Sequence, residues 1–223
     1  MLRGFELELK ELKAELLKMG GYVEMAISKA TEALNSRDSS LLKEVRIVED
    51  KINAAHVTID NMCLEILARL SPVAADLRLI LSIVKINTDL ERMGDQAINI
   101  SYNTEHYLDD KLVEVSLELP KMSELVKAMV RDALDAFMNG DLKLAREVLS
   151  RDDAVDKIKN NSFKLLIPFM QSNPAKIEAA LDLILIARNL ERMGDHATNI
   201  AEDVIFTYTG VDIRHGFNHD EEE

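Results

Sequence analysis

Residues 189–200 read NLERMGDHATNI, and residues 89–100 carry a near-copy, DLERMGDQAINI. Between residues 90–100 and residues 190–200, nine of eleven positions are identical, at a spacing of 100 residues. The sequence around the two copies matches mainly in its pattern of apolar and polar residues. Such a repeat predicts that the chain contains two copies of one structural unit.

The first half of the chain is typical of long helices. Apolar residues at alternating spacings of three and four predict three helices, over residues 2–33, 41–66 and 73–107. The segments NSRDSS and SP, which lie between them, are typical of turns. Gly20 and Gly21 interrupt the first pattern, so they predict either a weak point or a close helix contact.

The second half repeats this order. Pro120 is well placed to open a fourth helix, MNGD stands where NSRD stood, and SNP stands where SP stood. The first two helices align with the fourth and fifth at an offset of 103 residues, and the third aligns with the sixth at an offset of 100. Pro168 lies inside the fifth helix and should kink it.

These patterns predict an all-α fold of two tandem three-helix bundles related by internal duplication. The expected boundaries are a first repeat at residues 1–108, a linker at 109–119, a second repeat at 120–210 and a flexible acidic tail at 211–223.

The composition limits what the chain can bind. Its 223 residues carry a formal net charge of −13, which argues against nucleic acid and anionic membranes as partners. No run approaches the roughly 20 apolar residues of a membrane span, so membrane insertion is not expected. The N-terminus lacks the apolar core of a signal peptide, and Cys63 is the single cysteine, so we expect a cytoplasmic protein.

Acidic residues recur on one face of several predicted helices. Residues four apart lie one above another on a helix, and like charges at that spacing repel by a few tenths of a kcal/mol. A cation between them would reverse the sign of that interaction. The second and third helices of a unit are antiparallel neighbours, so their acidic turns could meet across a groove. The candidate metal ligands are Glu49, Asp50, Asn53, Glu91, Asp95 and Asn99 in the first unit, and Asp152, Asp153, Asp156, Glu191, Asp195 and Asn199 in the second.

Carboxylate and amide oxygens are hard ligands, which suit magnesium, calcium, manganese or iron. Gly94 and Gly194 leave room for a close approach, either by a neighbouring backbone or by the site itself. Asp203 extends the acidic row of the sixth helix by one turn. The alternative interpretation is a solvated acidic surface, on which Arg92 and Arg192 form weak surface ion pairs.

Three segments give the sequence a family resemblance: the doubled LERMGD, SPVAADLR at residues 71–78 and YTGVDIRHG at residues 208–216. Together they make the whole chain resemble the PhoU family, the accessory and regulatory proteins of bacterial phosphate transport. The resemblance implies two similar three-helix bundles and multinuclear iron or zinc clusters held on the surface by E/D-x-x-x-D motifs. Those motifs fall on Glu91 and Asp95, Glu191 and Asp195, and Asp152 and Asp156, whereas the fourth runs from Glu49 to the amide of Asn53. We therefore expect stronger metal binding in the second unit.

The resemblance also implies a function. Such a protein damps the phosphate-starvation response as a negative regulator, acting between the ATPase subunit of the phosphate ABC importer and a membrane-bound sensor histidine kinase. The sequence contains no Glu-x-x-His pair of a di-iron oxidase, no Walker motif and no recognisable nucleophile signature, which favours a non-enzymatic adaptor. The alternatives are a carboxylate-bridged multinuclear metalloenzyme, a metal-storage helical protein and a bare helical scaffold. Exposed seams on long helices often pair, so we expect a homodimer.

Overall fold

The computed structural model describes residues 2–109 and 113–214, with side chains from residue 6 onward. Within these ranges the chain forms no strand, and the predicted all-α fold is confirmed. Residues 110–112 of the expected linker and 215–223 of the expected tail lie outside the described residues. The helices are α1 (Leu2–Ser36), α2 (Ser40–Leu70), α3 (Ala75–Asp109), α4 (Leu119–Asn139), α5 (Leu142–Ser172) and α6 (Ile177–Thr209), with a short 3-10 turn, η1 (Pro174–Lys176), before α6.

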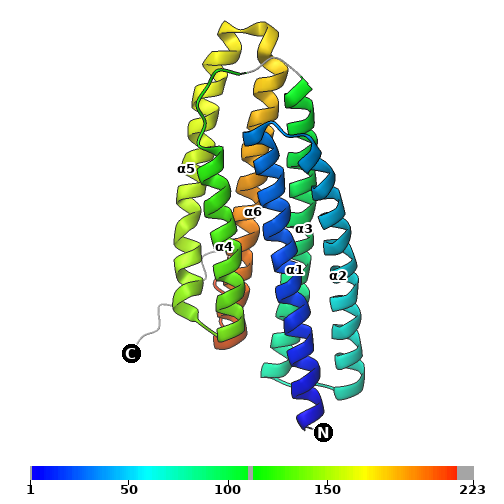
Figure 1. The fold of residues 1–223 in the computed structure, drawn as a ribbon. Coiled ribbons are helices and arrows are strands. Elements are labelled where there is room, and N and C mark those ends of the chain that lie inside the picture. Colours follow the sequence, from blue (N-terminus) through cyan, green and yellow to red (C-terminus); the bar gives the residue numbers. More distant parts are fainter. Residues whose placement is uncertain (1, 110–112, 215–223) are drawn as a thin grey trace, which may run out of the picture.

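Each half of the chain folds into three long helices, and the two halves lie side by side (Figure 1). Helices α1 and α3 of the first unit pack against α4 and α6 of the second, while α2 and α5 lie on the outer sides. The buried apolar residues of all six helices form one continuous cluster. No described helix combines the length and the apolar character that crossing a membrane requires.

The two units face each other through matching surfaces. A Cβ atom at Gly20 of α1 would collide with Leu134 Cδ1 of α4. Adding the offset of 103 to residues 20 and 31 gives residues 123 and 134, and the hydroxyls of Thr31 and Ser123 lie 3.0 Å apart. The same pair of positions therefore meets twice, which means that α1 and α4 run antiparallel about a pseudo-twofold axis.

The glycine pair in α1 marks a close helix contact and not a break. Helix α1 continues from Leu2 to Ser36, and Gly20 is the position at which Leu134 approaches. A Cβ at Gly21 would meet nothing within 4 Å. Of the two readings of the glycine pair, the close contact is therefore the correct one.

Some helix details differ from the sequence-based expectations. The buried row of α2 includes Leu42 and Cys63, whereas their apolar neighbours Leu41 and Met62 are only half-buried. Helix α3 extends two residues past its expected end, to Asp109. Helix α5 continues through Pro168 as far as Ser172, and the kink expected there stays a prediction.

Candidate functional site

Glycine allows the second and third helices of each unit to pack closely. A Cβ at Gly194 of α6 would lie 3.4 Å from Val155 Cγ1 and 3.9 Å from Asp152 Oδ1, both on α5. In the first unit, a Cβ at Gly94 of α3 would lie 3.1 Å from Ile52 Cγ2 of α2. The close neighbour is thus a side chain in both units and not a backbone. This packing places the acidic turns of α5 beside those of α6.

Four carboxylates gather where α5 and α6 meet, and we call Asp152, Asp156, Glu191 and Asp195 the second-unit acidic cluster. Burial, followed by repulsion from Glu191 and Asp152, raises the pKa of Asp195 to about 6. Burial, followed by repulsion from Asp156 and Glu191, also raises the pKa of Asp152. The cluster therefore holds more negative charge than its surroundings neutralise.

Lys159 of α5 closes one end of this cluster. Its Nζ donates hydrogen bonds to Asp156 Oδ1 at 2.7 Å and to Glu191 Oε1 at 2.6 Å. Burial acts to lower the pKa of this lysine, but the two hydrogen bonds outweigh it, and the net shift is upward. A bound cation would have to share these two carboxylates with an ammonium group or displace it.

The first unit is arranged differently at the matching positions. Asn53 Nδ2 donates a hydrogen bond of 2.5 Å to Glu49 Oε1 on the same helix. The position that matches Lys159 is His56, whose Nε2 lies 3.4 Å from Asp60 Oδ2. Glu91 of α3, which matches Glu191, has no ion pair or hydrogen-bond partner for its side chain within the described ranges. The first unit therefore has no lysine between its acidic turns.

Not all of the predicted ligands join these groups. Residues four apart on a helix drift by about 40° around its axis, so the end of a long row turns away from its start. Asn199 Nδ2 donates to Asp89 Oδ1 of α3 at 3.3 Å, and the buried Asp203 accepts a hydrogen bond of 3.0 Å from Lys85. The expected extension of the acidic row through Asp203 is therefore wrong, because this carboxylate faces α3. The remaining predicted ligands are exposed: Asp50, Asp95, Asn99 and Asp153. Asp153 adds to the repulsion that raises the pKa of Asp152, whereas the side chains of the other three form no hydrogen bond or ion pair with a described residue.

The described residues contain no group of three or more His, Cys, Asp or Glu side chains already arranged to hold a metal ion. The second-unit acidic cluster nevertheless has the donor chemistry of a hard-cation site, since it brings four carboxylates near one another and Lys159 is the cation hydrogen-bonded to two of them. Arg92 and Arg192 do not supply that neutralisation, because neither forms an ion pair with a described residue. The surface ion pairs considered for these arginines are absent from this part of the structure.

The polar contacts that join the two units are not predicted by the sequence pattern. His196 Nδ1 of α6 lies 2.8 Å from Asp89 Oδ1 of α3, and both side chains are largely buried. The sequence does distinguish Asp89 from its counterpart, because the second copy of the repeat has Asn189 at the matching position. The contact between Lys159 and Asp156 could also have been predicted, since the two residues are three apart and lie on one helix face.

An all-helical protein of two duplicated three-helix units, with paired acidic turns on its surface, is the class that this fold and site define. The PhoU domain matches the chain twice, at residues 16–104 and 119–204. The chain belongs to the PhoU family.

Relatives named "Phosphate-specific transport system accessory protein PhoU homolog" cover nearly the full chain. The Pseudomonas putida protein is 41% identical over 95% of this chain and 83% of its own length. The Pseudomonas aeruginosa protein is 40% identical over 95% of this chain and 88% of its own. These names describe accessory proteins, which agrees with the prediction of a chain that is not an enzyme.

Two crystal structures resemble the fold closely. PhoU from Pseudomonas aeruginosa has a TM-score of 0.89 and 39% identity, and the match covers 93% of this chain and 100% of that one. The phosphate transport system regulatory protein PhoU from Streptococcus pneumoniae has a TM-score of 0.83 and 30% identity, with 93% and 98% covered. The two-unit architecture is therefore that of the family.

Proposed function

We propose that this protein regulates phosphate uptake and represses the phosphate-starvation response. It would do so as a non-enzymatic adaptor between the ATPase subunit of a phosphate ABC importer and a sensor histidine kinase. The observation that carries this proposal is the match to phosphate-specific transport accessory proteins along 95% of the chain. The proposed setting is the cytoplasmic side of the membrane, with the protein acting as a homodimer.

A genetic experiment tests the regulatory role. Deleting the gene should leave phosphate-starvation genes switched on in phosphate-rich medium, and the wild-type gene should restore repression. An extract containing the purified chain should show no phosphatase or oxidase turnover attributable to it. Normal phosphate control in the deletion strain, together with substrate turnover by the purified chain, would support the metalloenzyme instead.

Charge provides a test of direct partner contact. The chain carries a net charge of −13, so a basic surface on its partner would be steered toward it. We expect association with the ATPase subunit or the kinase to slow as salt rises from about 50 mM to about 500 mM, because the Debye length shortens over this range. An association rate that does not change with salt would argue against an electrostatically steered contact.

We also propose that metal binds to the acidic turns, most strongly in the second unit. Asp152, Asp156, Glu191 and Asp195 would hold the ion, with iron or zinc implied by the family and manganese, magnesium or calcium compatible with the oxygen donors. A bound cation would supply positive charge between α5 and α6 and would link the two helices.

The test is the metal content of protein purified without a histidine tag. Replacing Asp95 and Asp195 together with alanine should lower bound iron, zinc or manganese, while circular dichroism stays nearly unchanged. A double variant that retains all of its metal would return these residues to the role of a solvated acidic surface.

A further inference from the structure

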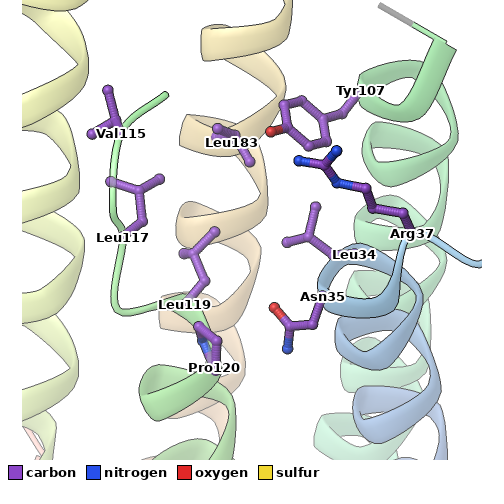
Figure 2. A pocket seen from close by; sticks show the side chains of 9 residues that line it. All are labelled: Leu34, Asn35, Arg37, Tyr107, Val115, Leu117, Leu119, Pro120 and Leu183. Atoms are coloured by element: carbon purple, nitrogen blue, oxygen red, sulfur yellow. The ribbon is translucent and has the colours of Figure 1, made fainter. Parts of the chain in front are cut away.

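A pocket of about 200 Å³ opens between the two units, at the end where α1 finishes and α4 begins. We call it the interunit pocket. Figure 2 shows that its walls come from both units and from the segment joining them. Six of the nine residues that line it have apolar side chains, including Leu34, Leu117, Leu119 and Leu183, and the polar side chains are those of Asn35, Arg37 and Tyr107.

Arg37 has a backbone conformation that arginine rarely adopts. Its φ angle is +58°, and Gly140, which occupies the matching position in the second unit, has a φ of +66°. In both units this residue follows a long helix, and the next residue donates a backbone hydrogen bond to the helix, from Asp38 in the first unit and Asp141 in the second. The second unit uses the residue that this conformation favours, whereas the first uses a long cationic side chain.

In the second unit, the side chain of Tyr208 covers the turn at Gly140, which corresponds to the turn at Arg37. A Cβ at Gly140 would lie 2.9 Å from Cε1 of the Tyr208 ring, and the Tyr208 hydroxyl donates a hydrogen bond of 2.8 Å to the Phe137 carbonyl. In the first unit the residue matching Tyr208 is Leu108, which has no hydroxyl and a smaller side chain. The duplication thus provides an internal comparison: the turn is closed by tyrosine in one unit and borders a pocket in the other.

Two polar groups that line the interunit pocket have no partner among the described residues. Tyr107 is only 6% exposed, and its hydroxyl makes no hydrogen bond with any residue that the structure describes. The Arg37 guanidinium likewise has no ion pair or hydrogen bond within residues 6–109 and 113–214. Both groups point into the same space in Figure 2. Arg37 is an exposed residue, so it places an unpaired positive charge at the edge of this pocket beside the Tyr107 hydroxyl, and an anion bound there would give both groups a partner.

We propose that the interunit pocket binds a small amphipathic anion, an aliphatic carboxylate whose chain contacts the leucines and whose carboxylate pairs with Arg37. The planar guanidinium matches a carboxylate through two parallel hydrogen bonds, and the Tyr107 hydroxyl can donate a third. Among the described residues that line the pocket, Arg37 is the one cation, and its charge has to offset the repulsion that a strongly acidic protein exerts on an anion. None of the residues that line this pocket belongs to the second-unit acidic cluster.

The experiment titrates the full chain with 4-methylpentanoate and, in parallel, with its neutral amide, by calorimetry and ligand-observed NMR. A ligand of this size should bind with a dissociation constant on the order of 1 mM. The amide should bind about tenfold more weakly, because it lacks the charge that strengthens the hydrogen bonds to Arg37.

Three variants make the test specific. Arg37→Gly restores the residue of the second unit, so it should fold, and it should lose about tenfold in affinity. Arg37→Gly combined with Leu108→Tyr rebuilds the closed turn and should abolish binding. Lys43→Gln removes an exposed cation elsewhere and should bind as the wild type does. Equal affinity for the acid and the amide, undiminished binding by Arg37→Gly, or no wild-type binding at about 10 mM would each overturn the proposal.

Discussion

Lys159 sets the charge balance of the acidic cluster. It is held by Asp156 at 2.7 Å and Glu191 at 2.6 Å, which are two of the carboxylates proposed to hold a metal. The sequence favours stronger metal binding in the second unit, because Asp156 stands where the first unit has the amide of Asn53. Lys159 opposes this preference, because it competes with a metal ion for the same carboxylates. The first unit, with His56 at that position, has no such competitor.

Replacing Lys159 with glutamine should therefore strengthen metal binding in the second unit. Removing an ammonium group that contacts two ligands should raise the affinity for Mn²⁺ about tenfold, as measured by calorimetry. Lys157→Gln, an exposed neighbour on the same helix, serves as the charge-matched control and should change affinity little. An equal gain in both variants would mean that general charge, and not the hydrogen-bonded lysine, controls binding.

The raised pKa of Asp195 makes stability depend on pH in a defined direction. Its pKa is about 6 in the folded chain, compared with an ordinary value of 3.8, so between these values the folded state binds the proton more tightly. Folding stability from this group therefore increases as pH falls from about 6 to about 4, and its charge penalty is fully present above about 6.

Asp195→Asn removes this penalty. The variant should be more stable than wild type near pH 8, by no more than about 1 kcal/mol because the side chain is partly exposed and screened by solvent. The difference should disappear near pH 4, where the wild-type carboxyl is protonated. Urea unfolding at both pH values measures it, and a constant difference would show that repulsion within the cluster is not its source.

At the residue scale the sequence predicted the composition of the site better than its geometry. The repeat identified Asp152, Glu191 and Asp195, because they recur in register with acids of the first unit. It did not predict that Asn199 and Asp203 turn toward α3, since that depends on which neighbour meets each face of α6. Periodicity along one helix contains no information about its neighbours.

At the scale of a helix, periodicity predicted where elements form because each helix buries one apolar row. The turns could be predicted equally well, since NSRDSS and MNGD contain residues that commonly cap helices. Periodicity does not define the buried row of α2 uniquely, because adjacent positions such as Met62 and Cys63 are both apolar. Only the packing of α2 against α1 and α3 decides between them.

The two glycines of α1 allow a test of one helix contact. Gly21→Ala should stabilise the protein by about 0.5–1 kcal/mol, because alanine favours a helix and a Cβ there meets nothing within 4 Å. Gly20→Ala should instead lose about 1–2 kcal/mol, because its Cβ would force the buried Leu134 to move. Thermal unfolding of the two variants compares adjacent positions in the same helix.

A second substitution identifies the cause. Adding Leu134→Ala to each variant should make Gly20→Ala no longer destabilising relative to the same background, while leaving the gain from Gly21→Ala unchanged. If Gly20→Ala costs the same with and without Leu134, the loss does not come from the contact between α1 and α4.

At the scale of the whole molecule, duplication produced one core and not two. The third helices run antiparallel along each other, and polar pairs cross between them at several levels. His196 meets Asp89 at 2.8 Å, and Thr207 donates to Ser82 at 2.7 Å. The sequence predicted the repeat, but not this arrangement, because a pairing between residues more than 100 positions apart leaves no periodic signal.

A shared core has a consequence for a chain cut between the units. Cleavage at a protease site introduced within residues 113–118 should leave two mostly helical fragments that stay together, since separation would expose the apolar faces of α1, α3, α4 and α6 to water. Separation of the fragments would also leave buried polar groups such as Asp89 and Ser82 without their hydrogen-bond partners. The cleaved protein should elute from gel filtration with the intact chain and unfold in a single transition.

The midpoint of that transition should fall when the cleaved protein is diluted, by a few degrees over about a hundredfold dilution, because reassembly has become bimolecular. The uncut chain, heated at the same concentrations, is the control: its midpoint should be less sensitive to dilution, and it should reveal any dimer that also dissociates. Two independent transitions, or separate elution of the fragments at micromolar concentration, would mean that each three-helix unit is stable alone. In that case the contacts between α3 and α6 would orient the two units without being needed to fold them.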